Sequence, residues 1–416
     1  MSKLIVTGGN FLEGTITVSG AKNAVLPIIA ASLLSPEPLC IDDAPHLLDV
    51  EVMCQVIGSF GSQVKRVGSQ LLINTAEITS VQAPHELVSK MRASIVTMGP
   101  LLARTGHVRI SHPGGCAIGS RPINWHLKGL EALGAEVRMD HGYLDVTAPV
   151  LKGARIYLDF PSVGATENIM MAAAGAEGTT LIENAAQEPE IVDLANFLNQ
   201  MGGKVRGAGT SVIHIEGVHE FHGANHTVIP DRIEAGSYLL MAAASGGDVF
   251  VQNVITDHLK PVLAKMDEAG IEFQEEDEGI RVRGDGKYHA VDIKTQVHPG
   301  FPTDLQAPFL ALLCMAKGTG MVTETVFENR FMHVDELKRM GADIKIEGRS
   351  AIVQGVERLN GAQVTATDLR AGAALILSAL TAEGETEISG VQHIDRGYEG
   401  IEHKLNGIGA KIRRED

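Results

Sequence analysis

The stretch LGAEV at residues 133–137 has an apolar residue, then a glycine, and then another apolar residue three positions after that glycine. The same pattern returns five more times along the 416-residue chain. The other copies are FGSQV at 60–64, MGGKV at 201–205, AGIEF at 269–273, MGADI at 340–344 and IGAKI at 408–412. Their glycines lie 73, 68, 68, 71 and 68 residues apart. This regular spacing indicates six repeats of about 70 residues.

Each repeat contains the same predicted elements in the same order. An alanine-rich apolar helix is followed by a β-rich run, a more polar helix that ends at the repeat glycine, and a pair of short strands. Glycine is favoured just after a helix end, and the His-Gly and Glu-Gly dipeptides of VRMDHGYLDVT and IKIEGRSAIVQG suit hairpin turns. The apolar helices are predicted over residues 24–34, 89–103, 165–176, 232–244, 304–316 and 368–380.

These six helices are apolar on nearly all faces, so each is expected to be buried. Three repeats around a threefold axis achieve this with the helices inside and the sheets outside. We therefore predict an α/β fold: a two-domain inside-out α/β barrel with three repeats per domain. One domain is expected at 22–229 and the other at 1–21 plus 230–416, with the active site in the cleft between them. The amino-terminal strand at 4–9 is expected to complete the sixth repeat, which predicts a double crossover between the domains.

Composition excludes several classes of protein. A formal net charge of -16 argues against a general nucleic-acid or membrane-surface binder, but a few cations in one cleft can still capture a small anion. The longest apolar runs are far too short to cross a bilayer. The four cysteines have no zinc-site spacing, and neither GxxxxGK[ST] nor a GxGxxG loop after a strand occurs. We expect a cytoplasmic protein without metal or cofactor.

Charged residues recur at or near the starts of the apolar helices. They are Lys22, Arg92, Glu167, Arg232, Asp304 and Arg370. Helix amino termini carry free N–H groups and the positive end of the helix dipole, so they attract anions. Cations there suggest a bound anion. The alternative for the neighbouring polar residues is that Asp231, Thr303 and Asp368 are N-caps.

The loop HPGGCAIGSRP at 112–122 holds Cys116 among three glycines, with Arg121 five residues on. A free cysteine is usually a small buried residue, and we expect that for Cys40, Cys54 and Cys314. Cys116 lies in no predicted helix or strand, so it is the candidate functional thiol. A nearby arginine favours the thiolate, whereas a proton donor must keep its proton.

The chain resembles the UDP-N-acetylglucosamine 1-carboxyvinyltransferases along its whole length. The motifs that carry the resemblance are SGAKNAVLP, MRASI, PGGCAIGSRP, SVGAT, ENAAQEPEIVD, PDRIEAG, GFPTDLQA, TETVFENRFMHVDEL, ATDLRAGA and HIDRGYEGIE. The resemblance implies an inside-out α/β barrel pair. It also implies transfer of the enolpyruvyl group of phosphoenolpyruvate to the 3-hydroxyl of UDP-N-acetylglucosamine with release of phosphate, the first committed step of bacterial peptidoglycan synthesis.

The resemblance also implies roles for individual residues. Cys116 matches the proton donor, which can also hold phosphoenolpyruvate as a covalent adduct. Asp304 matches the base for the sugar hydroxyl, and partial desolvation is the expected means of raising its pKa. Groups around phosphoenolpyruvate are matched by Lys22, Arg121 and Arg396. Further cleft cations are matched by Arg330 and Arg370, with Asp368 as a partner or second acid–base group. Contacts to the uridine nucleotide are matched by Asn23, Arg92, Arg121, Pro122, Ile123, Asn124, Trp125, Ser162, Val163, Gly164 and Val326.

One departure from the family pattern concerns the nucleotide side of the site. The family commonly has Asp-Leu before the histidine of this loop, where this chain has Asn124 and Trp125 before His126. Trp125 either stacks on a ligand or covers the loop. His126, His333 and His393 are expected to be structural, as are Glu188 and Glu190 near a helix start.

Two other functions remain open from the sequence. One is the related transfer to shikimate 3-phosphate, whose family lacks the cysteine loop. The other is a non-catalytic paralogue that binds the nucleotide and regulates the pathway. The sequence does not fix the oligomeric state.

Overall fold

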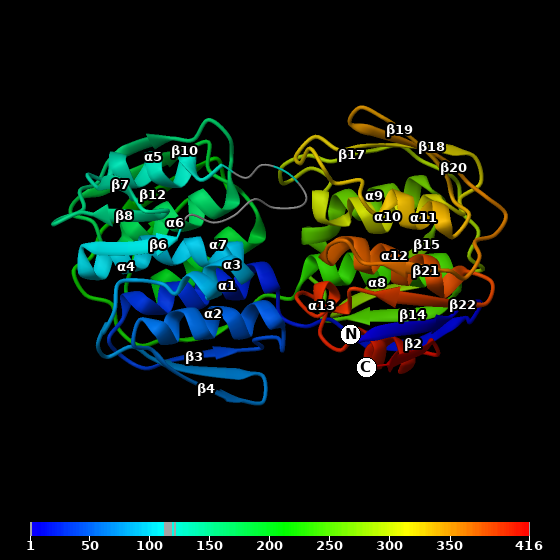
Figure 1. Ribbon diagram of the computed structural model, residues 1–416, viewed down its shortest axis with the longest axis horizontal. Helices are drawn as coiled ribbons and strands as arrows, with labels where there is room; N and C mark the ends of the chain where they lie inside the picture. Colours follow the sequence, from blue (N-terminus) through cyan, green and yellow to red (C-terminus); the bar gives the residue numbers. More distant parts are fainter. Residues whose placement is uncertain (1, 112–118, 120–121, 416) are drawn as a thin grey trace. The chain divides into compact units, whose positions relative to one another are not determined.

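The computed structural model describes residues 2–111, 119 and 122–415, which form two compact units. Unit 1 holds residues 2–19, 119 and 230–415, and unit 2 holds residues 20–111 and 122–229. The chain passes between the units at residues 19–20 and again at 229–230. Figure 1 shows helices surrounded by short strands in each unit.

In the described residues, each unit carries three sheets with one common plan. In five of the sheets a connecting strand pairs in parallel with a central strand, and two antiparallel strands follow, which form a hairpin in all but the sheet of β1 and β23. The sheet of β6 has three strands, and a single parallel bridge between Gln82 and Arg109 stands in place of its connecting strand. In unit 2 the sheets are β13 (Asn225–Thr227), β3 (Leu39–Asp42), β5 (Gln70–Asn74), β4 (Gln63–Val67); β6 (His107–Ser111), β8 (Tyr143–Thr147), β7 (Glu136–Asp140); and β9 (Arg155–Tyr157), β10 (Thr179–Glu183), β12 (Val212–Glu216), β11 (Lys204–Arg206). In unit 1 they are β2 (Leu12–Thr17), β14 (Gly247–Gln252), β16 (Gly279–Gly284), β15 (Glu272–Glu276); β17 (Ile293–Lys294), β18 (Thr319–Thr323), β20 (Ser350–Gln354), β19 (Asp343–Glu347); and β21 (Gln363–Thr365), β22 (Glu385–Ser389), β1 (Lys3–Thr7), β23 (Lys411–Glu415).

The amino-terminal segment supplies strands to two sheets of unit 1. Strand β1 lies antiparallel between β22 and β23, in the place that the second hairpin strand takes in the other sheets. Strand β2 pairs in parallel with β14 as the connecting strand of the fourth repeat. The prediction that the amino-terminal strand completes the sixth repeat is confirmed.

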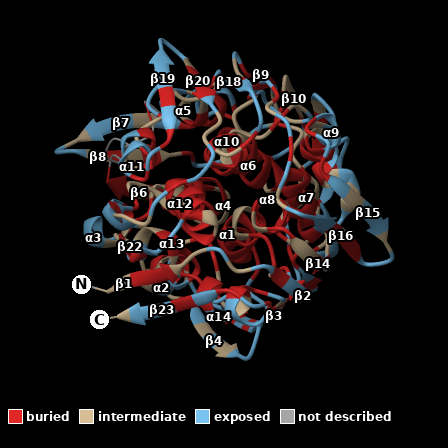
Figure 2. Cartoon of the chain, turned by 90° about the vertical axis from the view of Figure 1, so that its right-hand side faces the viewer, coloured by how far each residue is buried: buried red, intermediate tan, exposed pale blue. Residues whose placement is uncertain are grey.

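The apolar helices form the cores of the two units. They are α1 (Lys22–Ala31), α4 (Met98–Thr105) and α6 (Val163–Ala174) in unit 2, and α8 (Arg232–Ser245), α10 (Gln306–Leu313) and α12 (Leu369–Thr381) in unit 1. Figure 2 shows burial concentrated on these helices and exposure on outer strands such as β15 and β19. Glycines allow close packing, because a Cβ at Gly99 would overlap the Asn168 carbonyl and one at Gly372 would overlap Ile394. The predicted inside-out arrangement is confirmed.

The second, more polar helix of each repeat ends two or three residues before its repeat glycine. These helices are α2 (Leu48–Ser59), α5 (Asn124–Ala132), α7 (Pro189–Gln200), α9 (Lys260–Glu268), α11 (Val334–Arg339) and α14 (Ile401–Asn406). All six glycines have positive φ, between 76° and 115°. In each case the N–H of the next residue donates to the carbonyl five residues earlier, as Ala135 does to Leu130 and Ala342 does to Leu337. The repeat pattern is therefore a helix-terminating Schellman motif that turns the chain into the hairpin.

One predicted helix is wrong in detail. The helix expected over 89–103 is split into α3 (His85–Lys90), an extended Met91, the 3-10 helix η2 (Arg92–Thr97) and α4. Pro100 lacks the N–H that a continuous α-helix needs at that position. In the structure Pro100 lies in the first turn of α4, where an N–H has no partner within the helix.

Two repeat glycines of unit 2, Gly134 and Gly61, allow the effect of backbone strain on stability to be distinguished from the effect of crowding around an added Cβ. A Cβ at Gly134 would find only the Val150 carbonyl at 3.9 Å, whereas one at Gly61 would lie 2.7 Å from the Glu77 carbonyl. We expect Gly134→Ala to lower the free energy of unfolding by about 1–2 kcal/mol, the cost of positive φ alone, and Gly61→Ala to lower it further. Urea denaturation provides the measurement. Equal effects of the two substitutions would contradict this explanation.

Candidate active site

In unit 1, Asp304 lies between two arginine side chains. It belongs to the 3-10 helix η4 (Thr303–Leu305) that leads into α10. Its Oδ1 accepts from Arg330 Nη2 at 2.6 Å, and its Oδ2 accepts from Arg370 Nη2 at 3.0 Å. The arginine side chains are 4% and 3% exposed, while the carboxylate side chain is 26% exposed. Asp304 is therefore the accessible member of a largely buried, charge-paired trio.

Two guanidinium groups flank the Asp304 carboxylate, because η4, α12 and the segment after β18 meet at this point. A carboxylate offers about four lone-pair sites, and the side chain of Asp304 is 26% exposed. Asp304 can thus contact a substrate hydroxyl while the arginines hold its orientation.

Arg370 is fixed from both of its ends. It is the second residue of α12, whose N-cap Asp368 accepts from the backbone N–H groups of Arg370 and Ala371. Its Nη1 donates to the Tyr398 hydroxyl at 3.2 Å, and that hydroxyl also pairs with Ser237. Burial is the largest single influence and lowers the pKa of Arg370, but Asp304, Tyr398 and Asp231 together raise it above its usual value. Arg370 therefore stays cationic inside the fold.

The predictions about N-caps are partly confirmed. Asp231 and Asp368 cap α8 and α12 through their carboxylates, and Ser162 caps α6 through its hydroxyl. Thr303 is not an N-cap: its hydroxyl instead accepts from Arg330 Nη1 at 2.7 Å and donates to Glu324. Glu167 does not lie at a helix start either, because α6 begins at Val163 and leaves Glu167 one turn inside. Burial, then Glu190 and Glu188, raise the pKa of Glu167 well above its usual value.

In unit 2, Lys22 begins α1 and pairs with Asp49 in the first turn of α2 at 3.1 Å. The side chains are 12% and 5% exposed. This protein carboxylate explains how a lysine is tolerated at the start of a buried helix. Asn23 follows Lys22 in α1, and Arg92 begins η2 as a half-buried residue.

The predicted nucleotide contacts of unit 2 lie around the starts of α5 and α6. Trp125 stacks on Phe160, with ring centroids 5.3 Å apart, so it has an aromatic partner within the protein. His126 Nδ1 is 3.0 Å from the Asn168 amide nitrogen, and burial together with Arg92 lowers the pKa of His126 to about 4. A neutral, paired histidine fits its expected structural role. The remaining described members of this set are exposed Pro122, buried Ile123, exposed Asn124 and partly buried Ser162, Val163 and Gly164.

Two of the predicted residues, Cys116 and Arg121, lie outside the described residues. Arg396 is half-buried between α13 (Val391–Ile394) and α14, and Val326 is half-buried after β18. Buried His333 has its pKa lowered to about 4, mainly by desolvation. Sequence reasoning did not single out Tyr398 or Glu324, because a buried tyrosine or glutamate carries no local signal of the arginine network it supports.

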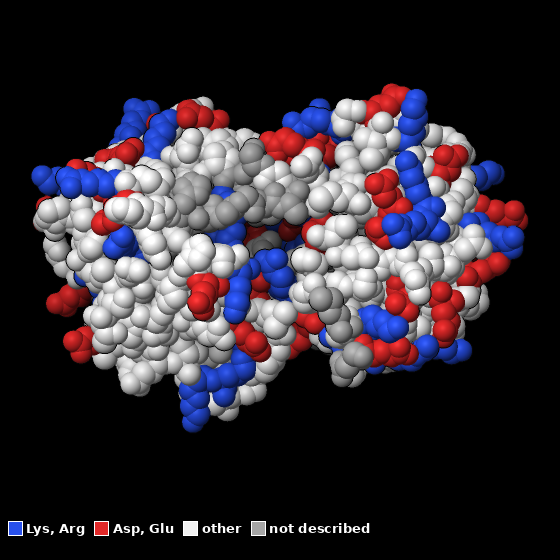
Figure 3. Space-filling model, in the orientation of Figure 1, with Lys and Arg blue, Asp and Glu red and all other residues white. Residues whose placement is uncertain are grey.

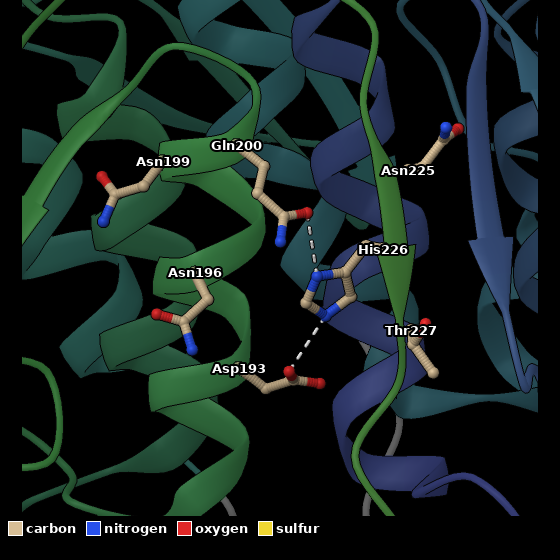
Figure 4. A pocket seen from close by; sticks show the side chains of 7 residues that line it. All are labelled: Asp193, Asn196, Asn199, Gln200, Asn225, His226 and Thr227. Atoms are coloured by element: carbon tan, nitrogen blue, oxygen red, sulfur yellow. Dashed lines mark hydrogen bonds and ion pairs between the residues drawn. The ribbon is translucent and has the colours of Figure 1, made fainter.

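An open groove of about 660 Å³ in unit 2 contains none of the predicted residues. Figure 4 shows its lining from α7 and β13: Asp193, Asn196, Asn199, Gln200, Asn225, His226 and Thr227. His226 is 2.9 Å from Asp193 Oδ1 and 3.1 Å from Gln200 Oε1. These contacts hold β13 against α7, so we assign the groove a structural role.

The described residues contain no group of metal-ligating side chains and no helix long and apolar enough to cross a membrane. On the face of unit 1 in Figure 3, acidic and basic side chains are interspersed. Among the ion pairs of unit 1, Arg281 pairs with both Asp248 and Glu276.

A profile of the EPSP synthase family, 3-phosphoshikimate 1-carboxyvinyltransferase, matches residues 6–405. The UDP-N-acetylglucosamine 1-carboxyvinyltransferase 1 of Caldanaerobacter subterraneus is 59% identical over 413 residues, which is 99% of each chain. The chain belongs to the EPSP synthase family, among its UDP-N-acetylglucosamine 1-carboxyvinyltransferases. The carboxyvinyltransferase 2 of Carboxydothermus hydrogenoformans is also 59% identical, covering 100% of this chain and 99% of its own.

Solved structures agree on the fold of this carboxyvinyltransferase family member. The enolpyruvyl transferase NikO from Streptomyces tendae matches with a TM-score of 0.90 at 24% identity, covering 99% of this chain and 98% of its own. EPSP synthase from Acinetobacter baumannii matches with a TM-score of 0.78 at 18% identity, covering 100% of both chains. At these identities the likeness establishes the two-domain inside-out α/β architecture alone.

Proposed function

We propose that the chain transfers the enolpyruvyl group of phosphoenolpyruvate to the 3-hydroxyl of UDP-N-acetylglucosamine and releases phosphate. Addition forms a bond from the sugar oxygen to C2 of phosphoenolpyruvate, and C3 gains a proton. Elimination then breaks the C2–O bond to phosphate and removes a proton from C3. The names of relatives at 58–59% identity support this reaction. The observation that carries it is the partly exposed carboxylate of Asp304 between two buried arginines.

Each chemical requirement of this reaction has a candidate residue. Asp304 accepts the proton of the sugar hydroxyl, and Cys116 delivers a proton to C3. Lys22, Arg121 and Arg396 surround the phosphate and carboxylate of phosphoenolpyruvate. Arg330 and Arg370 add positive charge near the reacting carbon, where guanidinium forks suit anionic oxygens.

The residues of unit 2 that the motifs predict as nucleotide contacts, together with Val326, bind the uridine nucleotide on this proposal. We further propose that residues of both units act on one substrate pair. On this proposal the protein works in the cytoplasm on two small molecules and needs no cofactor.

Phosphate release tests the reaction directly. The protein is mixed with phosphoenolpyruvate and either UDP-N-acetylglucosamine or shikimate 3-phosphate, and phosphate is measured over time. Release with the nucleotide sugar alone is the expected result. Release with shikimate 3-phosphate would instead support the related transferase. Nucleotide binding without release would support the regulatory paralogue.

An epoxide mimic of phosphoenolpyruvate, such as fosfomycin, is expected to alkylate Cys116 selectively. Thiolates, not thiols, are the nucleophiles. Burial raises the pKa of Cys54 to about 11 and of Cys314 to about 12, and burial also raises the pKa of Cys40. These three thiols therefore stay protonated near pH 7. Peptide mass spectrometry locates the label, and a label mainly on any of these three would contradict the assignment.

A further inference from the structure

Glu324 is a buried carboxylate. Through one hydroxyl group it is linked to Asp304, Arg330 and Arg370, which together form the Asp304 cluster. It follows β18 directly and is 1% exposed. Its Oε2 accepts from the Thr303 hydroxyl at 2.8 Å. Its Oε1 accepts from the Thr295 hydroxyl at 2.9 Å and from the backbone N–H groups of Val326 and Phe327 at 2.8 and 3.1 Å. Four donors thus satisfy this carboxylate inside unit 1.

The hydrogen bonds between Glu324 and Asp304 have a fixed direction. Arg330 can only donate, and an ionised carboxylate can only accept. Because Thr303 gives its hydroxyl proton to Glu324, its oxygen lone pairs remain available for Arg330 Nη1 at 2.7 Å. The other terminal nitrogen of Arg330 then reaches Asp304 Oδ1 at 2.6 Å. Glu324 therefore sets the orientation of the guanidinium that holds the proposed base.

Glu324 also breaks the symmetry of the repeats. In four other repeats the residue just after the central strand has a positive φ: Asp43 at 55°, Asn184 at 54°, Asn253 at 64° and Gly390 at 74°. Asn184 and Asn253 each use the side chain to bond a backbone carbonyl of the neighbouring segment. Glu324 lacks the positive φ and turns instead toward Thr303 and the Val326 loop. Departures from a repeated local solution are expected at functional sites.

We infer that Glu324 is a positioning residue for the proposed transfer, acting through Thr303 and Arg330 on Asp304 and directly on the Val326 segment. This inference rests on the proposed function, because it assigns the reaction to the Asp304 cluster. The two carboxylate oxygens of Glu324 have different partners. Oε2 accepts from Thr303 and so acts on Asp304, the proposed base. Oε1 accepts from the Val326 segment, which is predicted to contact the nucleotide.

The substitution Glu324→Gln removes the contact of one oxygen and keeps the contacts of the other. The amide oxygen can keep the three donors at the Oε1 position, while the amide nitrogen at the Oε2 position cannot accept from Thr303. We expect kcat to fall roughly 10- to 100-fold, as when a buried hydrogen-bonding group loses its partner, with KM for UDP-N-acetylglucosamine within about twofold of wild type. Glu324→Ala should raise that KM as well. Thr303→Val should lower kcat by a similar factor, whereas Thr303→Ser should keep most of the wild-type kcat. The double variant Glu324→Gln with Thr303→Val should have a kcat no lower than that of either single variant.

Asn253→Ala provides the matched control, since it removes a side-chain hydrogen bond at the equivalent position of the fourth repeat without a path to Arg330. Urea denaturation of every variant tests folding. Asn253→Ala should lose stability but keep wild-type kcat. A wild-type kcat in Glu324→Gln, or additive losses of kcat in the double variant, would overturn this inference and leave the proposed function standing. A wild-type protein that releases no phosphate would overturn the proposed function and this inference together.

Discussion

Replacing Cys116 with serine is expected to lower kcat for phosphate release by roughly 10²- to 10⁴-fold, the usual contribution of a positioned general acid. A serine hydroxyl is far less acidic than a thiol, so it cannot deliver the proton to C3 of phosphoenolpyruvate at a comparable rate. Binding of UDP-N-acetylglucosamine should change little, because the substitution removes one sulfur atom and leaves the arginines in place. Steady-state phosphate release and calorimetric titration with the nucleotide give the two readouts.

Two further variants sharpen this expectation. Cys116→Asp should retain much more activity than Cys116→Ser, since a carboxyl group can also donate a proton. Cys40→Ser is the matched control, because Cys40 lies in β3 and pairs with no predicted site residue. Near-normal turnover in Cys116→Ser would exclude the proton-donor role.

Asp304→Asn is expected to lower kcat by roughly 10²-fold or more, because the amide keeps the size of the carboxylate but cannot take a proton from the sugar hydroxyl. The substitution also removes the negative charge that pairs with Arg330 and Arg370, whose side chains are 4% and 3% exposed. Two buried cations without their carboxylate repel each other and lose charge-assisted hydrogen bonds. The urea midpoint should therefore fall together with the activity.

Asp248→Asn is the control for this second effect. Asp248 also sits between two arginines, with Arg281 Nη1 at 2.8 Å and Arg283 Nε at 3.0 Å, but its side chain is 40% exposed on an outer sheet. Solvent screening makes such a surface pair weak. Asp248→Asn should keep wild-type kcat and nearly wild-type stability. If Asp304→Asn turned over substrate as fast as Asp248→Asn does, Asp304 could not be the base.

The repeat and its glycines could be read from the sequence because their causes are local. A helix that must end and turn into a hairpin needs a positive φ, and glycine meets that need at each of the six positions. Helices apolar on all faces can only be buried, which forces the sheets outward. Two expectations were wrong: the helix over 89–103 is interrupted, with Pro100 in the first turn of α4, and the Thr303 hydroxyl donates to Glu324, 21 residues away, instead of capping a helix.

The sequence by itself determined the sixfold α/β repeat, the inside-out burial and the inventory of charged groups, because periodicity, glycine conformation and residue chemistry are properties of short segments. The tertiary structure alone decided which charges meet. Asp304 contacts Arg330, 26 residues away, and Arg370, 66 residues away, and Lys22 contacts Asp49 from another helix. Such pairs depend on how three repeats pack around a common core, since packing brings the starts of distant helices within hydrogen-bonding distance and no segment encodes that distance alone.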